Sequence, residues 1–331
     1  RRAQCSPDAR CCQGFYQRRR WPAFDGLAGV TYNGVARGAP AMGDCPERIS
    51  ENPLWRRAWE VRQEHFAPRI RFERPLATLA VSVTGAACAL RCAHCNGHYL
   101  AGMRRLDDPA LDAARSLLIS GGCDHEGRVP VLPHLDAIAR LAAGRRLNWH
   151  VGLIDEDTAR AIRSYADVIS FDFVGDDDTI REVYGLAKTV GDYAACFQML
   201  RRYARVVPHV TIGLYGGRLR GERRALEILR SLGADELVLI VFIPTPGTAF
   251  AACEPPRVNE VVDLIAEARV RFFDVPVRLG CMRPGGEYRE QLDRLAVEVG
   301  LNGIVNPVRG AVRAAERLGL QIEWGDECCV L

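Results

Sequence analysis

The chain has 331 residues, 48% of them hydrophobic and 26% charged, and a formal net charge of +3. These values predict one large globular domain, or a barrel with attachments, and do not favour nucleic acid as a partner. The longest unbroken apolar run, Leu237–Ile243, is far too short to span a bilayer. Because residues 1–5 lack the apolar core of a signal peptide, we expect a cytoplasmic protein with no membrane partner.

The chain begins with a segment that shows no regular pattern. Residues 1–50 are rich in Gly, Pro and Cys, which predicts an irregular arm. The following stretch, Glu51–Phe66, has a broad apolar face and is predicted to be a helix. We therefore expect an N-terminal arm and helix over residues 1–75, a barrel over 76–320 and a short C-terminal extension over 321–331.

From residue 77 onward, short β-branched or apolar runs alternate with amphipathic stretches. This alternation is typical of strand–helix units around a parallel sheet. The predicted strands are Thr78–Val83, Leu117–Ser120, Leu147–Gly152, Val168–Phe173, Val206–Gly213, Leu237–Ile243, Val275–Leu279 and Gly303–Asn306. The predicted helices between them are Leu132–Ala143, Asp157–Ala166, Asp192–Ala204, Glu222–Ser231, Val258–Phe272 and Glu287–Val299. Such a series predicts an α/β fold, a (β/α)8 TIM-type barrel.

Three cysteines follow the first predicted strand: Cys88, Cys92 and Cys95. Three thiolates in so short a stretch can hold three irons of a [4Fe–4S] cube and leave the fourth iron open to a substrate. In a barrel of this type, catalytic groups lie at the carboxyl ends of the strands, which is where this motif falls. The sequence therefore predicts an open-site iron–sulfur cluster.

Three other uses of these cysteines fit less well. A zinc ribbon needs a second pair of ligands at short spacing, but the next candidate, Cys123 with His125, lies further on and lacks its partner cysteine. A disulfide framework is unnecessary in a chain of this size, which can bury a large core. A closed electron-transfer cluster needs a nearby fourth cysteine, and none follows the motif before Cys123.

The C-x3-C-x2-C spacing of the motif resembles the signature of the radical S-adenosylmethionine (SAM) superfamily. The resemblance implies that the open iron chelates the amino and carboxylate groups of SAM, and that the cluster passes an electron to the sulfonium. The 5′-deoxyadenosyl radical released in this way removes hydrogen from unreactive C–H bonds. The resemblance also implies an electron donor, such as ferredoxin or flavodoxin.

Two further features suit the binding of SAM, the first by resemblance to that superfamily and the second by its chemistry. Gly121 and Gly122 end a predicted strand, where a glycine pair lets a ligand approach the backbone, although a plain tight turn would also explain it. The resemblance implies that this backbone binds the amino group of SAM. Asp172 ends another strand, and its carboxylate can accept hydrogen bonds from both ribose hydroxyls. For Asp177 and Asp178 we favour an N-cap and first-turn role in the next helix.

The resemblance narrows to the biotin synthase branch through Thr84–Gly85, the cysteine motif, the glycine pair and the turn Pro244–Thr248. The stretches Ser120–Cys123, Gly280–Pro284 and Glu327–Cys329 look like those of the biotin-synthase-related subunits of two-component lipoyl synthases. This likeness implies sulfur insertion at an unactivated carbon of an octanoyl-type chain, with a second iron–sulfur cluster as the sulfur donor. A carrier protein or peptide would bear the acyl substrate, and a second radical SAM subunit could take part.

Thirteen cysteines are more than packing alone accounts for, which makes a second cluster plausible. Cys123, Cys281 and Cys328 are its candidate ligands, and each could instead be a small buried hydrophobic residue. The spacing Cys5-x5-Cys11 departs from the auxiliary-cluster motif of single-chain lipoyl synthases. Two other functions stay open: a radical SAM enzyme of cofactor biosynthesis that inserts no sulfur, and a non-catalytic iron–sulfur partner subunit.

Overall fold

The computed structural model describes residues 51–331. Within this part, helices and strands follow one another from Pro53 to Gly325. The predicted irregular arm, with Cys5 and Cys11, lies outside the described residues.

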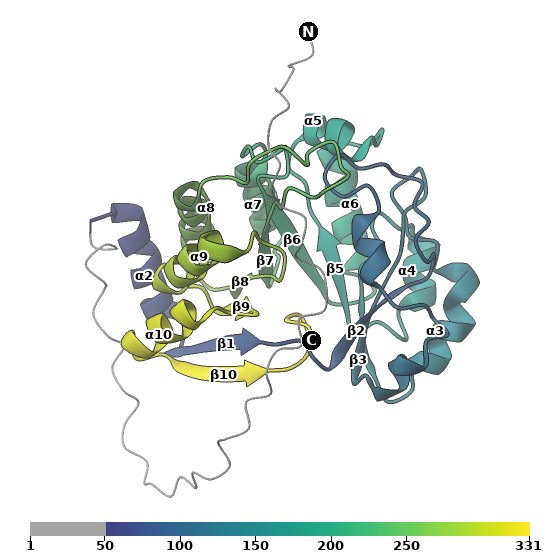
Figure 1. Ribbon diagram of the computed structural model, residues 1–331, viewed down its shortest axis with the longest axis horizontal. Helices are drawn as coiled ribbons and strands as arrows, with labels where there is room; N and C mark the ends of the chain where they lie inside the picture. Colours follow the sequence, from purple (N-terminus) through teal and green to yellow (C-terminus); the bar gives the residue numbers. More distant parts are fainter. Residues whose placement is uncertain (1–50) are drawn as a thin grey trace, which may run out of the picture. The chain divides into compact units, whose positions relative to one another are not determined.

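A ten-stranded sheet forms the centre of the described part, and every neighbouring pair of strands in it is parallel. The strand order is β10-β1-β9-β8-β7-β6-β5-β4-β3-β2. The sheet curls, so that β1 and β10 point toward the beginning of β2 and β3 (Figure 1). The strands are β1 Arg69–Glu73, β2 Thr78–Ser82, β3 Ser116–Ser120, β4 Arg146–Trp149, β5 Val168–Asp172, β6 Val206–Ile212, β7 Leu237–Val241, β8 Val277–Leu279, β9 Gly303–Val305 and β10 Gln321–Gly325.

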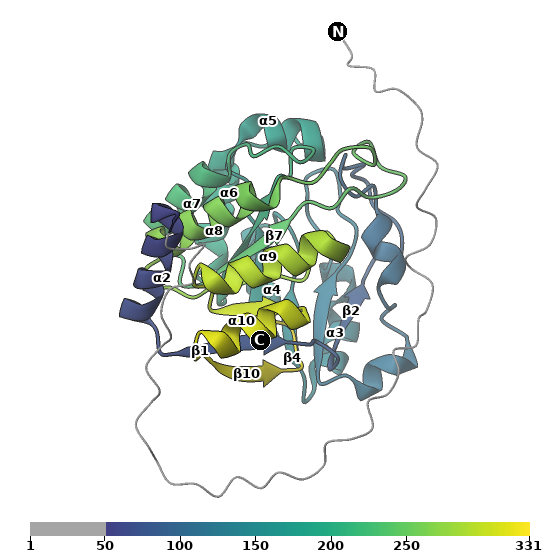
Figure 2. The same ribbon diagram turned by 60° about the vertical axis from the view of Figure 1, so that its left-hand side comes forward.

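Helices cover the outer side of this sheet, and α9 and α10 pack side by side there (Figure 2). None of the helices within residues 51–331 is both long enough and apolar enough to cross a membrane. The α-helices are α2 Pro53–His65, α3 Leu135–Ala142, α4 Glu156–Ile162, α5 Asp177–Thr179, α6 Val190–Leu200, α7 Glu222–Ser231, α8 Val258–Arg271, α9 Gly286–Glu298 and α10 Arg309–Arg317.

The predicted α/β barrel class is confirmed, and all of the predicted strands are present as β2 to β9. The strands β1 and β10 were not predicted. In β1 the buried Ile70 and Phe72 alternate with charged residues, so the strand lacks the continuous apolar run that marks its neighbours. The edges of the sheet are β10 and β2, and these two strands do not pair with each other.

Alternation along the strands divides the buried side chains between two faces of the sheet. Ile169 belongs to the large core between the sheet and the helices. Its neighbour Val168 belongs to a small inner cluster with Val207 and Val238, from the starts of β6 and β7. The inner face is therefore apolar at the beginning of these strands. Polar side chains occupy it nearer their carboxyl ends.

Candidate active site

The three motif cysteines lie in the loop that follows β2, residues 83–97, called here the cysteine loop. The loop is fixed to the end of β3, because the Ala89 amide donates to the Cys123 carbonyl oxygen at 2.8 Å. A turn then brings two of the thiols together, with the Cys95 amide donating to the Cys92 carbonyl oxygen at 3.2 Å. The carboxyl end of β2 therefore presents the motif where a barrel carries its catalytic groups.

The thiols of the cysteine loop interact electrostatically. A hydrogen bond from the Cys92 thiol, assisted by His94, lowers the pKa of Cys95 to about 4. The same hydrogen bond and burial raise the pKa of Cys92, which also interacts with Cys88. The loop thus offers three neighbouring thiols, one of them already a thiolate, which is the form that ligates metal. This donor set fits a cluster held by three cysteines.

One residue of this site, His94, was not predicted. Within residues 51–331, the only three metal-ligating side chains whose ligand atoms all lie within 4.8 Å of one another are Cys92, His94 and Cys95. The His94 ring packs edge-on against Tyr184, and its Nδ1 is buried without a hydrogen-bond partner. Donors this close together suit a single ion, whereas a cube spreads its thiolates over separate irons. A cube would need the thiolate of Cys88, together with those of Cys92 and Cys95, in place of the His94 ring.

The glycine pair that ends β3 packs against the cysteine loop. A Cβ on Gly122 would lie 1.9 Å from the Ala87 carbonyl oxygen and 2.6 Å from the Cα of Cys88. A Cβ on Gly121 would lie 3.1 Å from the Thr84 hydroxyl oxygen, which also accepts a hydrogen bond from the Gly122 amide at 2.7 Å. The close approach that requires glycine here is therefore between two protein segments. Binding of the SAM amino group by this backbone stays a prediction.

The loop after β7 contacts the cysteine loop and the short helix that follows it. The hydroxyl oxygens of Tyr99 and Thr245 lie 2.9 Å apart. The Asn96 side-chain amide donates to the Gly247 carbonyl oxygen at 3.3 Å. The structure thus places the turn Pro244–Thr248, which is part of the likeness to the biotin synthase branch, beside the cysteine loop.

Asp172, the candidate ribose ligand, lies at the end of β5 in a polar cluster on the inner face. Its Oδ2 is 3.1 Å from His150 Nε2, and the His209 ring stacks on that of His150. The side chains of His150 and Asp172 keep exposed fractions of 34% and 39%, and Asp172 Oδ1 has no hydrogen-bond partner. That oxygen can accept a hydrogen bond from a ligand, although its ribose role stays a prediction. No spacing in the sequence singles out the two histidines.

The charges of this cluster follow from burial and pairing. Burial alone would raise the pKa of Asp172, but the charge and hydrogen bond of His150 outweigh it and lower the pKa to about 2. Burial acts to lower the pKa of His150, whereas Asp172 raises it above its ordinary value overall. Burial lowers the pKa of His209 to about 4. At neutral pH the cluster therefore holds a charged carboxylate and a neutral His209.

Replacing Asp172 by asparagine is expected to lower the pKa of His150 below its ordinary value, about 6.5. The attraction of the carboxylate is lost in this variant, whereas burial of the ring remains. An NMR titration of the His150 ring signals measures the shift. Asp178→Asn is the control, because Asp178 pairs with Arg181 and Arg220 on the surface. An unchanged His150 pKa in Asp172→Asn would show that the ion pair does not form in solution.

The same pair has a defined effect on stability against pH. The pKa of Asp172 is lower in the folded chain than in the unfolded chain. Its contribution to the free energy of unfolding is therefore present above the unfolded-state pKa and is lost as pH falls through about 2. Because the pKa of His150 is raised, its contribution is lost as pH rises through that raised value. Stability from this pair is therefore greatest at mildly acidic pH.

The predicted structural role of the acidic run after β5 is confirmed. Asp176 is the N-cap of α5, and its carboxylate accepts from the Thr179 amide at 2.7 Å. Asp177 and Asp178 occupy the first turn of the helix, where negative charge is favourable.

The candidate ligands of a second cluster lie in two places. Cys123 belongs to the cysteine loop site, because its carbonyl oxygen is 3.8 Å from the Cys88 sulfur. The Cys328 sulfur lies 3.4 Å from the Asn148 side-chain nitrogen and interacts electrostatically with Cys281. The described contacts do not join all three thiols into one set, and their role as ligands stays a prediction.

No known protein family and no curated protein matches this sequence. Among solved structures, methylornithine synthase (PylB) is similar, with a TM-score of 0.60 and 14% identity over 82% of this chain and 88% of that chain. The FeFe-hydrogenase maturase HydG from Carboxydothermus hydrogenoformans is similar with a TM-score of 0.57 and 13% identity, over 76% of this chain and 62% of its own. This chain therefore spans less than two thirds of HydG. At these identities the likeness shows a shared fold.

Proposed function

We propose that this protein is a radical SAM enzyme, which cleaves SAM reductively and uses the resulting radical on a second substrate. The observation that carries this proposal is the set of three neighbouring thiols, Cys88, Cys92 and Cys95, in one loop at the carboxyl end of β2. The fold that the chain shares with a synthase and a maturase supports catalysis in this barrel. The place of the thiols supports it too, because barrel enzymes act at that end of their strands.

Different residues of the chain would bind the cluster and the separate parts of SAM. The motif cysteines would hold a [4Fe–4S] cluster, which supplies the electron that splits SAM when it is bound. The backbone at Gly121 and Gly122 would bind the amino group of SAM, and Asp172 Oδ1 would accept from a ribose hydroxyl. The turn Pro244–Thr248 would lie along the adenine. A reductant of the ferredoxin or flavodoxin class would supply the electron.

The test is the release of 5′-deoxyadenosine and methionine from SAM after anaerobic reconstitution with iron and sulfide, in the presence of a reductant. We expect both products from the wild-type protein and neither from a variant with alanine at all three motif cysteines. A wild-type protein that holds a cluster and cleaves no SAM would contradict the proposal. That result would favour a non-catalytic partner subunit.

Sulfur insertion into an octanoyl-type chain is the finer form of this proposal. It requires a second cluster, for which Cys123, Cys281 and Cys328 are the ligands to test first. The triple alanine variant of the motif would then keep about four irons per chain, the content of one cube. If that variant holds no iron, sulfur insertion is wrong. A carrier-borne acyl substrate and a second radical SAM subunit belong to this form of the proposal.

A radical SAM enzyme of cofactor biosynthesis without sulfur insertion is the second candidate, and the inner face of the sheet favours it. Asp172, His150, His209 and Asn148 line that face with charged and polar groups. An octanoyl chain placed there would remove these groups from water without offering them hydrogen bonds, which costs free energy. A substrate with its own polar groups would replace the lost hydrogen bonds and avoid that cost. Neither solved structure reported above carries a name that refers to sulfur.

A further inference from the structure

The two edges of the sheet are bridged by the C-terminal tail, residues 326–331. The Ala77 amide donates to the Asp326 carbonyl oxygen at 2.8 Å, and the Cys328 amide donates to the Thr78 hydroxyl at 2.8 Å. Because Thr78 is the first residue of β2, the tail begins beside the amino end of that strand. The tail therefore passes from one edge of the sheet, β10, to the other.

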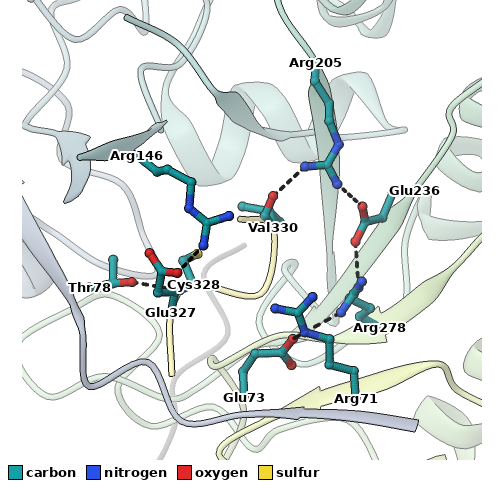
Figure 3. Close-up of polar contacts among 10 residues, drawn as sticks. All are labelled: Arg71, Glu73, Thr78, Arg146, Arg205, Glu236, Arg278, Glu327, Cys328 and Val330. Atoms are coloured by element: carbon teal, nitrogen blue, oxygen red, sulfur yellow. Dashed lines mark hydrogen bonds and ion pairs between the residues drawn. The ribbon is translucent and has the colours of Figure 1, made fainter. Parts of the chain in front are cut away.

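Arginines at the beginning of three strands hold the tail as it continues under the barrel. Each arginine lies at the first residue of its strand or just before it, so the contacts mark the amino-terminal end of the barrel. The guanidinium groups reach two tail carboxylates and one tail carbonyl oxygen. Arg115 pairs with Asp326. Figure 3 shows the other two contacts, Arg146 with Glu327, and Arg205 with the Val330 carbonyl oxygen at 2.6 Å.

The end of the tail is packed inside the barrel. Val330 is 1% exposed and joins Cys329 in the inner cluster with Val168, Val207 and Val238. These valines come from the starts of β5, β6 and β7, so the tail crosses the whole amino-terminal end of the barrel between β2 and β7. The apolar surface of Val330 that is removed from water in this way stabilises the packed position of the tail.

Arg205, which donates to the Val330 carbonyl oxygen, is one member of a series of ion pairs. Arg205 pairs with Glu236, which lies 2.6 Å from Arg278. Arg278 lies 3.3 Å from the fully buried carboxylate of Glu73, which Arg71 also contacts at 2.6 Å (Figure 3). The series connects the tail to β8 and to β1. A buried network of this kind loses much of its stability when one partner is removed.

We propose that residues 326–331 are a closing strap. In place of strand pairing between β10 and β2, the strap seals the amino-terminal end of the barrel and keeps large solutes away from the buried Cys329 and the inner cluster on which it packs. The ion pair between Arg146 and Glu327 fixes the strap in its middle. The strap requires no cluster and no SAM, so its test is independent of the proposed function.

The test uses a Val207→Cys background, which places one more thiol on the inner cluster at the start of β6. It measures how fast a polymer-linked maleimide, too large to pass between strands, modifies this thiol and the buried Cys329 in the reconstituted protein. Peptide mapping by mass spectrometry reads each cysteine separately. In Arg146→Glu we expect both to be modified at least about tenfold faster, because breaking a half-buried pair makes local opening easier. Adding Glu327→Arg to that variant restores the opposite charges, and the rates should return most of the way to those of Val207→Cys alone.

Two further variants keep the test decisive. Glu327→Gln removes the charge and keeps the shape, so it is used if Arg146→Glu does not fold, and it should speed modification of both cysteines. Arg105→Glu is the matched control, because Arg105 pairs with Asp107 on the surface, and its rates should equal those of Val207→Cys alone. Rapid modification of the thiol introduced by Val207→Cys, with the tail unchanged, overturns the proposal. So does faster modification of Cys329 alone in Arg146→Glu, which would mean that the tail loosens without closing anything.

Discussion

Replacing any one of Cys88, Cys92 and Cys95 by alanine is expected to reduce release of 5′-deoxyadenosine from SAM to background. Each variant leaves a second iron of the cube without a thiolate, so the cluster should decay. The measurements are iron content and product formation after anaerobic reconstitution.

Cys196→Ala provides the control for loss of a thiol as such. Cys196 lies on α6 and its thiol contacts the Ile154 carbonyl oxygen, far in sequence from the motif. The variant should hold as much iron as wild type and cleave SAM at the same rate. A motif variant that behaved like this control would remove that cysteine from the ligand set.

Alanine in place of Gly122 is expected to cost the protein most of its bound iron. The new Cβ would meet the Ala87 carbonyl oxygen at 1.9 Å and the Cβ of Cys88 at 2.7 Å. Because backbone atoms cannot move aside as a flexible side chain can, the cysteine loop must shift. Forcing an extra carbon into a packed site costs about 1–3 kcal/mol, and a cluster tolerates little displacement of its ligands.

The matched control is Gly102→Ala, just after the cysteine loop, where an added Cβ would meet nothing within 4 Å. We expect normal iron content there. Iron content and the visible spectrum distinguish the two variants, and far-ultraviolet circular dichroism shows whether both are folded. Full iron in Gly122→Ala would mean that the end of β3 does not position Cys88.

The sequence predicts most of the sheet because its central strands are marked by local composition. In β7, for example, Leu237–Val241 is a continuous apolar run, as expected of a strand covered on both faces. The strand β10 carries Gln321, Glu323 and Trp324 and has no such run. It is recognised as a strand only through its pairing with β1, and pairing between distant segments is not visible in a single sequence.

The cysteine motif is predicted for a similar reason, since its three ligands share one short loop and a fixed spacing. His150 directly follows β4 and His209 lies in β6, so only the folding of the sheet brings their rings together. The glycine pair was predicted to be a point where a ligand approaches the backbone, which stays a prediction. The approaching segment in the structure, however, is the protein's own cysteine loop, which local sequence cannot reveal.

The place of β1 in the sheet has a consequence for how this chain folds. Arg69 pairs with Gln321, and Arg71 pairs with Gly303, so the first strand of residues 51–331 lies between the last two strands of that range. Pairings between such distant segments form slowly, because the entropy cost of closing a long loop comes before the strand contacts that offset it. During synthesis, β2 to β8 can assemble while Ile70 and Phe72 still lack a neighbouring strand. A fragment that ends before residue 303 would leave β1 unpaired on both sides.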